Sequence, residues 1–159
     1  MNRCSNHAPE MHHGSLGQLT KKEIYMAKII DVEGIGPVYA EKLMAIGIKT
    51  TNKLLKAGAT PKGREELAEK TGINSKLILE WVNHADLFRI KGVGEEYSDL
   101  LEEAGVDTIP ELAQRNAENL YAKMVETNDL KKLVRQLPSQ RQVADWVAQA
   151  KTMPRMIHY

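Results

Sequence analysis

Two stretches of the sequence decide the fold: residues 34–47 read GIGPVYAEKLMAIG, and residues 92–105 read GVGEEYSDLLEEAG. Each begins with a Gly-hydrophobic-Gly turn, continues with a pattern typical of an amphipathic helix and closes on another glycine. The two turns are offset by 92 minus 34, or 58, residues. At that offset five further pairs match: Tyr39 with Tyr97, Leu43 with Leu101, Gly47 with Gly105, Thr50 with Thr108, and Leu54 with Leu112. The sequence therefore predicts a tandem repeat.

The correspondence extends further along the chain, where Glu80-Trp81-Val82 recurs as Asp145-Trp146-Val147. The offset there is 146 minus 81, or 65, so the second repeat carries a net insertion of 65 minus 58, or seven, residues. A short apolar run, a Gly-x-Gly turn, an amphipathic helix and a terminal glycine form the pattern of a helix-hairpin-helix, whose commonest use is to grip a nucleic-acid backbone. We expect an all-α fold of tandem helix-hairpin-helix pseudo-repeats, with about four to five helices in each.

The composition is that of a globular, helical chain. Hydrophobic residues make up 42% of the 159 residues and aromatic residues only 5%, which favours packed helices over strand-rich sandwiches. No apolar run approaches the roughly 18 residues that a membrane span needs, and the first residues lack the apolar core of a signal peptide. Cys4 is the single cysteine, so no internal disulfide can form. We expect a cytoplasmic protein with no membrane association.

The chain divides into three segments by pattern. Residues 1–25 are polar and without periodicity, which predicts a disordered N-terminal tail. Residues 26–88 would form the first repeat and residues 89–159 the second. The tail holds ligand types, but a structural zinc site needs four well-spaced ligands on a folded scaffold, so we expect only adventitious metal binding at Cys4, His7, His12 and His13.

Capping residues, prolines and glycines mark the ends of the helices expected within each repeat. Proline at the first helical position and glycine after the last predict a helix over 37–46. Caps and stop signals mark the next three helices: Thr50 or Thr51 to Gly58, Thr60 to Gly72, and Asn74 or Ser75 to about Ala85. In the second repeat we expect capping boxes at 108–111 and 139–142, and helices over 119–125 and 130–137. Residues 155–159 have no evident role.

Charge is distributed unevenly, although the formal net charge is only +1. Residues 42–76 hold eight basic residues against three acidic ones, a balance of +5. Residues 95–118 hold eight acidic residues against Arg115 alone, and residues 123–155 are rich in Lys and Arg. Solvated helix faces are the ordinary explanation for such runs, while a nucleic-acid contact is the functional one.

The two Gly-x-Gly turns are the candidate binding sites. A tight turn that enters a helix exposes backbone N–H groups without an intrahelical partner, and these donors suit a phosphate oxygen. The alternative is that each turn only connects packed helices. The expected nucleic-acid-binding residues are Gly34, Ile35, Gly36 and Lys42 in the first repeat, and Lys91, Gly92, Val93 and Gly94 in the second. Glu95 and Glu96 weaken the case for the second turn, because carboxylates there repel a phosphate.

No pattern of an enzyme is present. Tyr39 stands where a dinucleotide fingerprint needs its third glycine, and Arg64 and Glu65 replace the Lys and Ser/Thr of a P-loop. His84 and His158 appear isolated in the sequence. We therefore expect neither catalytic residues nor a metal centre.

The tryptophans allow two interpretations. Trp81 and Trp146 could stack on unpaired bases. Their equivalent places in the two repeats favour a role as core anchors, with Tyr39 and Tyr97 packing beside them.

The stretch Ile35-Gly36-Pro37-Val38-Tyr39-Ala40-Glu41-Lys42-Leu43 resembles the helix-hairpin-helix domain of RadA-type recombinases. More closely, residues 28–154 resemble a bacterial family of tandem helix-hairpin-helix proteins known as domain of unknown function 4332, through segments such as 59–64 and 89–97. The wider superfamily binds the DNA backbone without reading sequence, in some cases through a monovalent cation held by hairpin carbonyls. Its glycosylase branch adds a catalytic Asp after the hairpin, an arrangement that neither Asp31 nor Asp86 matches.

The sequence thus favours a non-enzymatic, sequence-independent DNA-binding protein, bacterial in type, with no cofactor. The resemblance adds one option, a monovalent cation at a hairpin. The alternative is a protein-interaction module that uses the acidic face of the second repeat. DNA is the expected partner of the first and a basic protein that of the second.

Overall fold

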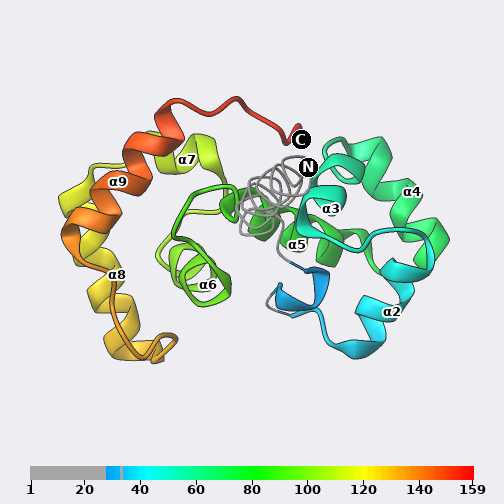
Figure 1. Ribbon diagram of the computed structural model, residues 1–159, viewed down its shortest axis with the longest axis horizontal. Coiled ribbons are helices and arrows are strands. Elements are labelled where there is room, and N and C mark those ends of the chain that lie inside the picture. The colour runs from blue at the N-terminus through cyan, green and yellow to red at the C-terminus, as the bar shows by residue number, and fades with distance from the viewer. Residues whose placement is uncertain (1–27, 33) are drawn as a thin grey trace, which may run out of the picture.

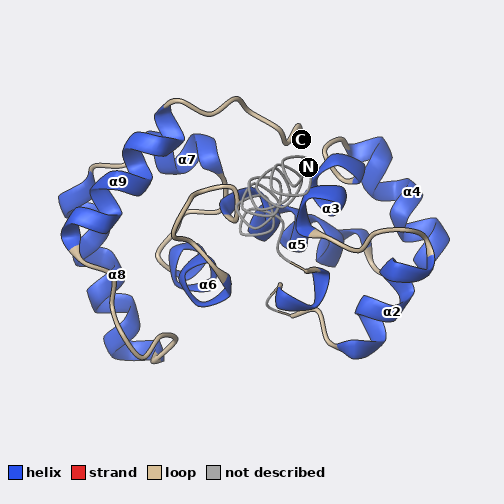
Figure 2. Ribbon diagram, in the orientation of Figure 1, coloured by secondary structure: helices blue, strands red, loops and turns tan. Residues whose placement is uncertain are grey.

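The computed structural model describes residues 28–32 and 34–159, and over these residues the chain is all-α (Figure 2). Eight α-helices follow a single 3-10 turn, and the described part has no strand beyond an isolated bridge between Lys28 and Thr50. The predicted all-α class is confirmed for the described residues. The expected tail, residues 1–25, lies outside the described residues.

The elements in chain order are η1 (Ile29–Asp31), α2 (Pro37–Ala45), α3 (Thr51–Ala57), α4 (Pro61–Thr71), α5 (Ser75–Leu87), α6 (Glu95–Glu103), α7 (Ile109–Ala113), α8 (Ala117–Lys131) and α9 (Gln140–Lys151). Figure 1 shows α2, α3 and α4 on one side of the molecule and α6 to α9 on the other, with α5 between them. No described helix combines the length and the apolar character that a membrane span requires.

Two hydrophobic cores lie along this arrangement. The first is built around Trp81 of α5 and Leu43, Leu54 and Leu55 of α2 and α3, all buried. The second gathers the side chains of α6 to α9 around Trp146. Helix α5 serves both cores, because its body packs in the first while its last residue, Leu87, belongs to the second. Burial of both tryptophans confirms their role as core anchors.

Helix starts in the first half follow the predicted caps. The side chains of Thr60 and Asn74 accept hydrogen bonds from the amides of Gly63 and Lys76, which would otherwise lack a partner. Gly72 ends α4 in the left-handed conformation, with φ of 75°. In the second half the capping box of Ser139 with Gln142 is present as predicted.

The predicted capping box at 108–111 is wrong. The Thr108 hydroxyl donates to the Glu111 carboxylate at 3.3 Å and caps no amide. The N-terminal amide of α7 is held instead by Asp86, whose Oδ2 accepts from the Ile109 amide at 2.9 Å. Asp86 is fully buried and its other oxygen pairs with Arg89 at 2.7 Å, so the cap comes from a residue far away in sequence.

The helix predicted over 130–137 is also wrong. Helix α8 is one continuous element from Ala117 to Lys131, and it ends at Lys132 in the left-handed conformation, with φ of 55°. Beyond it, the Asn128 side chain bonds both backbone groups of Val134, at 3.0 and 3.2 Å. An extended turn therefore satisfies the groups that a helix would have used.

The last residues form a strap that returns to the first half of the molecule. After α9 the chain runs back past α7 toward α3 (Figure 1). Ile157 is buried in the first core, and the His158 amide donates to the Ala59 carbonyl at 2.8 Å. Arg64, itself buried, donates to the His158 carbonyl at 3.0 Å and lies over the Tyr159 ring. Residues 155–159, which the sequence left without a role, tie the two halves together.

Candidate nucleic-acid interface

The two Gly-x-Gly turns share one backbone path. In the first, the Ile35 amide donates to the Val32 carbonyl at 3.0 Å; in the second, the Val93 amide donates to the Ile90 carbonyl at 3.1 Å. The first glycine of each turn has a positive φ, 91° at Gly34 and 98° at Gly92, which other residues rarely adopt. The correspondence seen in the sequence therefore extends to the backbone.

Each turn rests on an indole ring. A Cβ atom at Gly34 would lie 3.2 Å from Nε1 of Trp81, and one at Gly92 would lie 3.1 Å from Nε1 of Trp146. A tyrosine completes each pair: Tyr39 packs on Trp81 with ring centroids 5.1 Å apart, and Tyr97 packs on Trp146 at 5.3 Å. The first glycine of each turn is thus required by close packing as well as by its backbone angle.

The second glycine of each turn faces open space. Gly36 and Gly94 are the N-caps of α2 and α6, with ordinary φ angles of −83° and −110°. Neither helix start has a side-chain cap, and a Cβ built on either glycine meets nothing within 4 Å. The unbonded amides at these helix starts, which in α2 begin at Val38 because Pro37 has no N–H, lie beside this open space, and that geometry suits an anion.

The remaining predicted residues of the first turn divide by burial. The Ile35 side chain is buried, so only its backbone could meet a ligand. Lys42 is exposed on α2, four residues after Val38, which is 66% exposed. Residues four apart share a helix face, so Lys42 and Val38 form an exposed surface that continues from the turn.

The second turn is clamped by a residue that sequence reasoning missed. The side-chain amide of Gln149 on α9 accepts from the Lys91 amide at 2.9 Å and donates to the Lys91 carbonyl at 3.1 Å. Both backbone groups of Lys91 are thereby occupied, so only its exposed side chain is available to a ligand. A cation at the Lys91 carbonyl would have to compete with the Gln149 amide. The Val93 side chain is buried in the second core. No local pattern in the sequence indicates Gln149, because it lies 58 residues from Lys91.

Charge differs around the two turns as the sequence indicated. The basic segment of the first half presents exposed side chains at Lys42, Lys49, Lys53, Lys56, Lys62, Lys70 and Lys76. Arg64, counted in that segment, is buried against the strap and does not belong to the surface. Beside the second turn, Glu95 and Glu96 occupy the exposed first turn of α6.

Carboxylates crowd together beyond α6. Burial raises the pKa of Asp107, and the nearby negative charges of Glu111 and Glu102 raise it further. His84 lies close enough to oppose this shift. The raised pKa of Asp107 thus reflects its burial first and the neighbouring carboxylates second.

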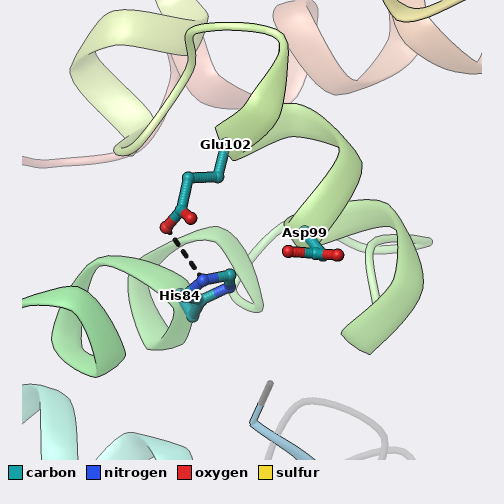
Figure 3. Close-up of side chains that lie close together, drawn as sticks. All are labelled: His84, Asp99 and Glu102. Atoms are coloured by element: carbon teal, nitrogen blue, oxygen red, sulfur yellow. Dashed lines mark ion pairs between the residues drawn. The ribbon is translucent and has the colours of Figure 1, made fainter. Parts of the chain in front are cut away.

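His84 is not isolated, contrary to the sequence-based expectation. It is 4% exposed on α5 and faces two carboxylates of α6, Asp99 and Glu102 (Figure 3). Its Nε2 atom lies 2.9 Å from Glu102 Oε2, and its Nδ1 atom lies 3.3 Å from Ser98 Oγ. One ligand atom from each of His84, Asp99 and Glu102 falls within 4.8 Å of the others. This cluster had no signal in the sequence, because its parts lie on separate helices.

Comparison with known proteins identifies the family and nothing more specific. The family described as a domain of unknown function (DUF4332) matches residues 33–153, well over half of the chain. The protein belongs to that family. No curated protein and no solved structure matched the chain. Family membership agrees with the resemblance of residues 28–154 and assigns no activity.

Proposed function

We propose that this family member is a tandem helix-hairpin-helix protein that binds the DNA backbone without reading sequence and without catalysing a reaction. The observation that carries the proposal is the pair of matched turns whose second glycines, Gly36 and Gly94, open onto uncapped helix starts with free space in front of them. Backbone donors at a helix start bind phosphate oxygens without contacting a base. The halves divided near residue 88 are the two units of this arrangement.

The first turn is the stronger site. Its helix carries exposed Lys42, whereas the second turn meets Glu95 and Glu96 and has the backbone of Lys91 clamped by Gln149. A carboxylate beside the donors repels an incoming phosphate and a lysine attracts it. The positive charge of the Lys91 side chain partly offsets these carboxylates. We therefore assign the second turn a supporting role in DNA binding.

Replacing the second glycine tests the site without disturbing the fold. Gly36→Asp places a favoured helix cap at a position where the backbone angle and the space allow it. The new carboxylate would bond the free amides of α2 and put a negative charge where the phosphate would sit. Gly34 is unsuitable for this purpose, because its positive φ and its contact with Trp81 make any substitution there a test of folding.

Fluorescence anisotropy with labelled duplex, single-stranded and junction DNA at low salt provides the readout. We expect binding that Gly36→Asp abolishes, that the matched Gly94→Asp weakens less, and that Gly36→Ala largely keeps. Between about 50 and 200 mM salt the affinity should fall roughly tenfold for two phosphate contacts. Absence of binding to all three DNAs at the lowest salt, or equal affinity for wild type and Gly36→Asp, would overturn the proposal.

A second candidate function rests on the carboxylates of the second half. The exposed acidic side chains Glu96 and Glu103, of which Glu103 pairs with Lys131, present negative charge on this half of the molecule. Such a surface fits a basic protein partner. The discriminating experiment is a pull-down that recovers the same partner after nuclease treatment and loses it with Glu96→Gln and Glu103→Gln combined. If nuclease treatment abolishes recovery of the partner, the association runs through DNA, and the DNA-binding proposal is favoured.

A further inference from the structure

The contact between α5 and α6 contains a chemical arrangement that the proposed function does not use. Figure 3 shows His84 rising from α5 and the carboxylates of Asp99 and Glu102 reaching toward it from α6. Asp99 and Glu102 are three residues apart on α6, so their side chains share one face of that helix. His84 is almost fully buried and the two carboxylates are half-buried.

The contacts around His84 fit the tautomer that carries its proton on Nδ1. The Ser98 hydroxyl donates to the Glu95 carbonyl at 2.9 Å, so its oxygen is left to accept. In that tautomer the His84 Nδ1 atom, 3.3 Å from this oxygen, donates to it. In the neutral ring this leaves Nε2 with a lone pair that points at the Glu102 carboxylate, 2.9 Å away. Two acceptors at that distance need a cation between them, either a proton or a metal ion.

We propose that His84, Asp99 and Glu102 form a site for a divalent transition-metal cation. One imidazole nitrogen and two carboxylate oxygens, all within 4.8 Å of one another, are the ligand types that zinc, cobalt and manganese accept. Ser98 is a positioning residue, because it orients the ring from the side opposite the ion. Three protein ligands leave further coordination positions to water.

The electrostatic surroundings suit a cation. Asp107 and Glu111 add negative charge near Glu102, and a bound dication would compensate it. The ligands come from two helices that join the halves of the molecule, since α5 packs in the first core and α6 in the second. Metal binding would therefore stabilise the junction as well as the site.

The test measures metal binding and does not involve DNA, so its outcome is independent of the proposed function. All proteins carry Cys4→Ser with His7→Ala, His12→Ala and His13→Ala, which removes the cysteine and the three histidines near the N-terminus. Zn²⁺ binding is followed by isothermal titration calorimetry, and Co²⁺ binding by its visible absorption. The critical variant is Glu102→Gln, and its matched control is Glu103→Gln, the next residue on α6, which pairs with Lys131 outside the cluster.

We expect one bound ion per chain, an affinity lowered at least tenfold by Glu102→Gln and about tenfold by Ser98→Ala, and no change with Glu103→Gln. Zn²⁺ should raise the melting temperature of the parent protein and leave that of Glu102→Gln unchanged, a readout that does not depend on fitting an affinity. His84→Gln should abolish binding, while His158→Gln, which removes an exposed imidazole, should not. No saturable binding, or binding equal in Glu102→Gln and Glu103→Gln, would show that only a proton lies between His84 and Glu102 and would overturn the proposal.

Discussion

At the scale of single residues, the two glycines of a turn have opposite requirements. Gly34 combines a φ of 91° with a neighbouring indole 3.2 Å from where a Cβ would lie, while Gly36 has an ordinary φ and free space. Both residues are glycines of one sequence motif, so the sequence does not reveal that their structural requirements differ. What distinguishes them is the position of Trp81, which only the packed structure supplies.

A pair of alanine variants should expose this difference. We expect Gly34→Ala to lower the free energy of unfolding by about 1–2 kcal/mol, because an L side chain is disfavoured at that backbone angle. Gly36→Ala should change it by less than about 1 kcal/mol. Urea denaturation followed by circular dichroism measures both, and equal losses in the two variants would contradict this account of the turn.

Asp107 is expected to give the protein a stability that depends on pH. Because its folded-state pKa is raised by burial and by neighbouring carboxylates, its contribution to stability is greatest below its ordinary value of 3.8 and is lost as pH rises through the folded pKa. At neutral pH, Asp107→Asn should therefore stabilise the protein, by no more than about 1 kcal/mol, since the carboxyl is partly exposed. The gain should shrink as the pH falls below the folded pKa.

Thermal melts across that pH range, with chelator present, provide the measurement. The exposed Asp129→Asn on α8 serves as the control for loss of one negative charge. A gain that persists unchanged into acid would mean that the amide stabilises by some other contact.

At the scale of elements, locally encoded helix ends were predictable and distant ones were not. Thr60, Asn74 and Ser139 cap amides two or three residues away, so the signal lies within a short window of sequence. The start of α7 depends on Asp86, which is 23 residues away, and the turn after α8 depends on the Asn128 side chain. The cluster at His84 and the clamp by Gln149 were missed for the same reason, because their partners lie on other helices.

Removing the distant cap should cost more than removing the predicted one. Asp86→Ala leaves a buried amide at Ile109 and the guanidinium of Arg89 without their shared acceptor, at a cost of about 3 kcal/mol. Thr108→Val keeps the shape of the side chain and should cost less than about 1 kcal/mol, since Thr108 caps no amide. Chemical denaturation of both variants gives the comparison, and a larger loss for Thr108→Val would restore the local capping box.

At the scale of the whole molecule, the strap makes the first core depend on the end of the chain. Ile157 fills part of a core whose other members lie mostly between residues 29 and 88, and Arg64, Ala59 and Asn83 hold the residues around it. A division of the sequence near residue 88 cannot foresee this contact. The pattern that located both turns carries no information about the path of the chain after α9.

Shortening Ile157 should therefore destabilise the half of the protein that is distant in sequence. We expect Ile157→Ala to cost about 2–4 kcal/mol and to speed hydrogen exchange of amides in α3 and α4. Leu130→Ala, at a site that is 79% exposed, should stay within about 0.5 kcal/mol of the wild type. Faster exchange confined to α8 and α9 would show that the strap stabilises only the half from which it comes.

The indole behind each turn also makes the protein its own spectroscopic probe. Trp81 and Trp146 are the two tryptophans of the chain, and each is buried against the first glycine of one turn. In Trp146→Phe the remaining emission comes from the first turn, and in Trp81→Phe it comes from the second. A DNA titration of these two proteins would assign bound DNA to one turn, to the other or to both, without an attached fluorophore and without altering either glycine.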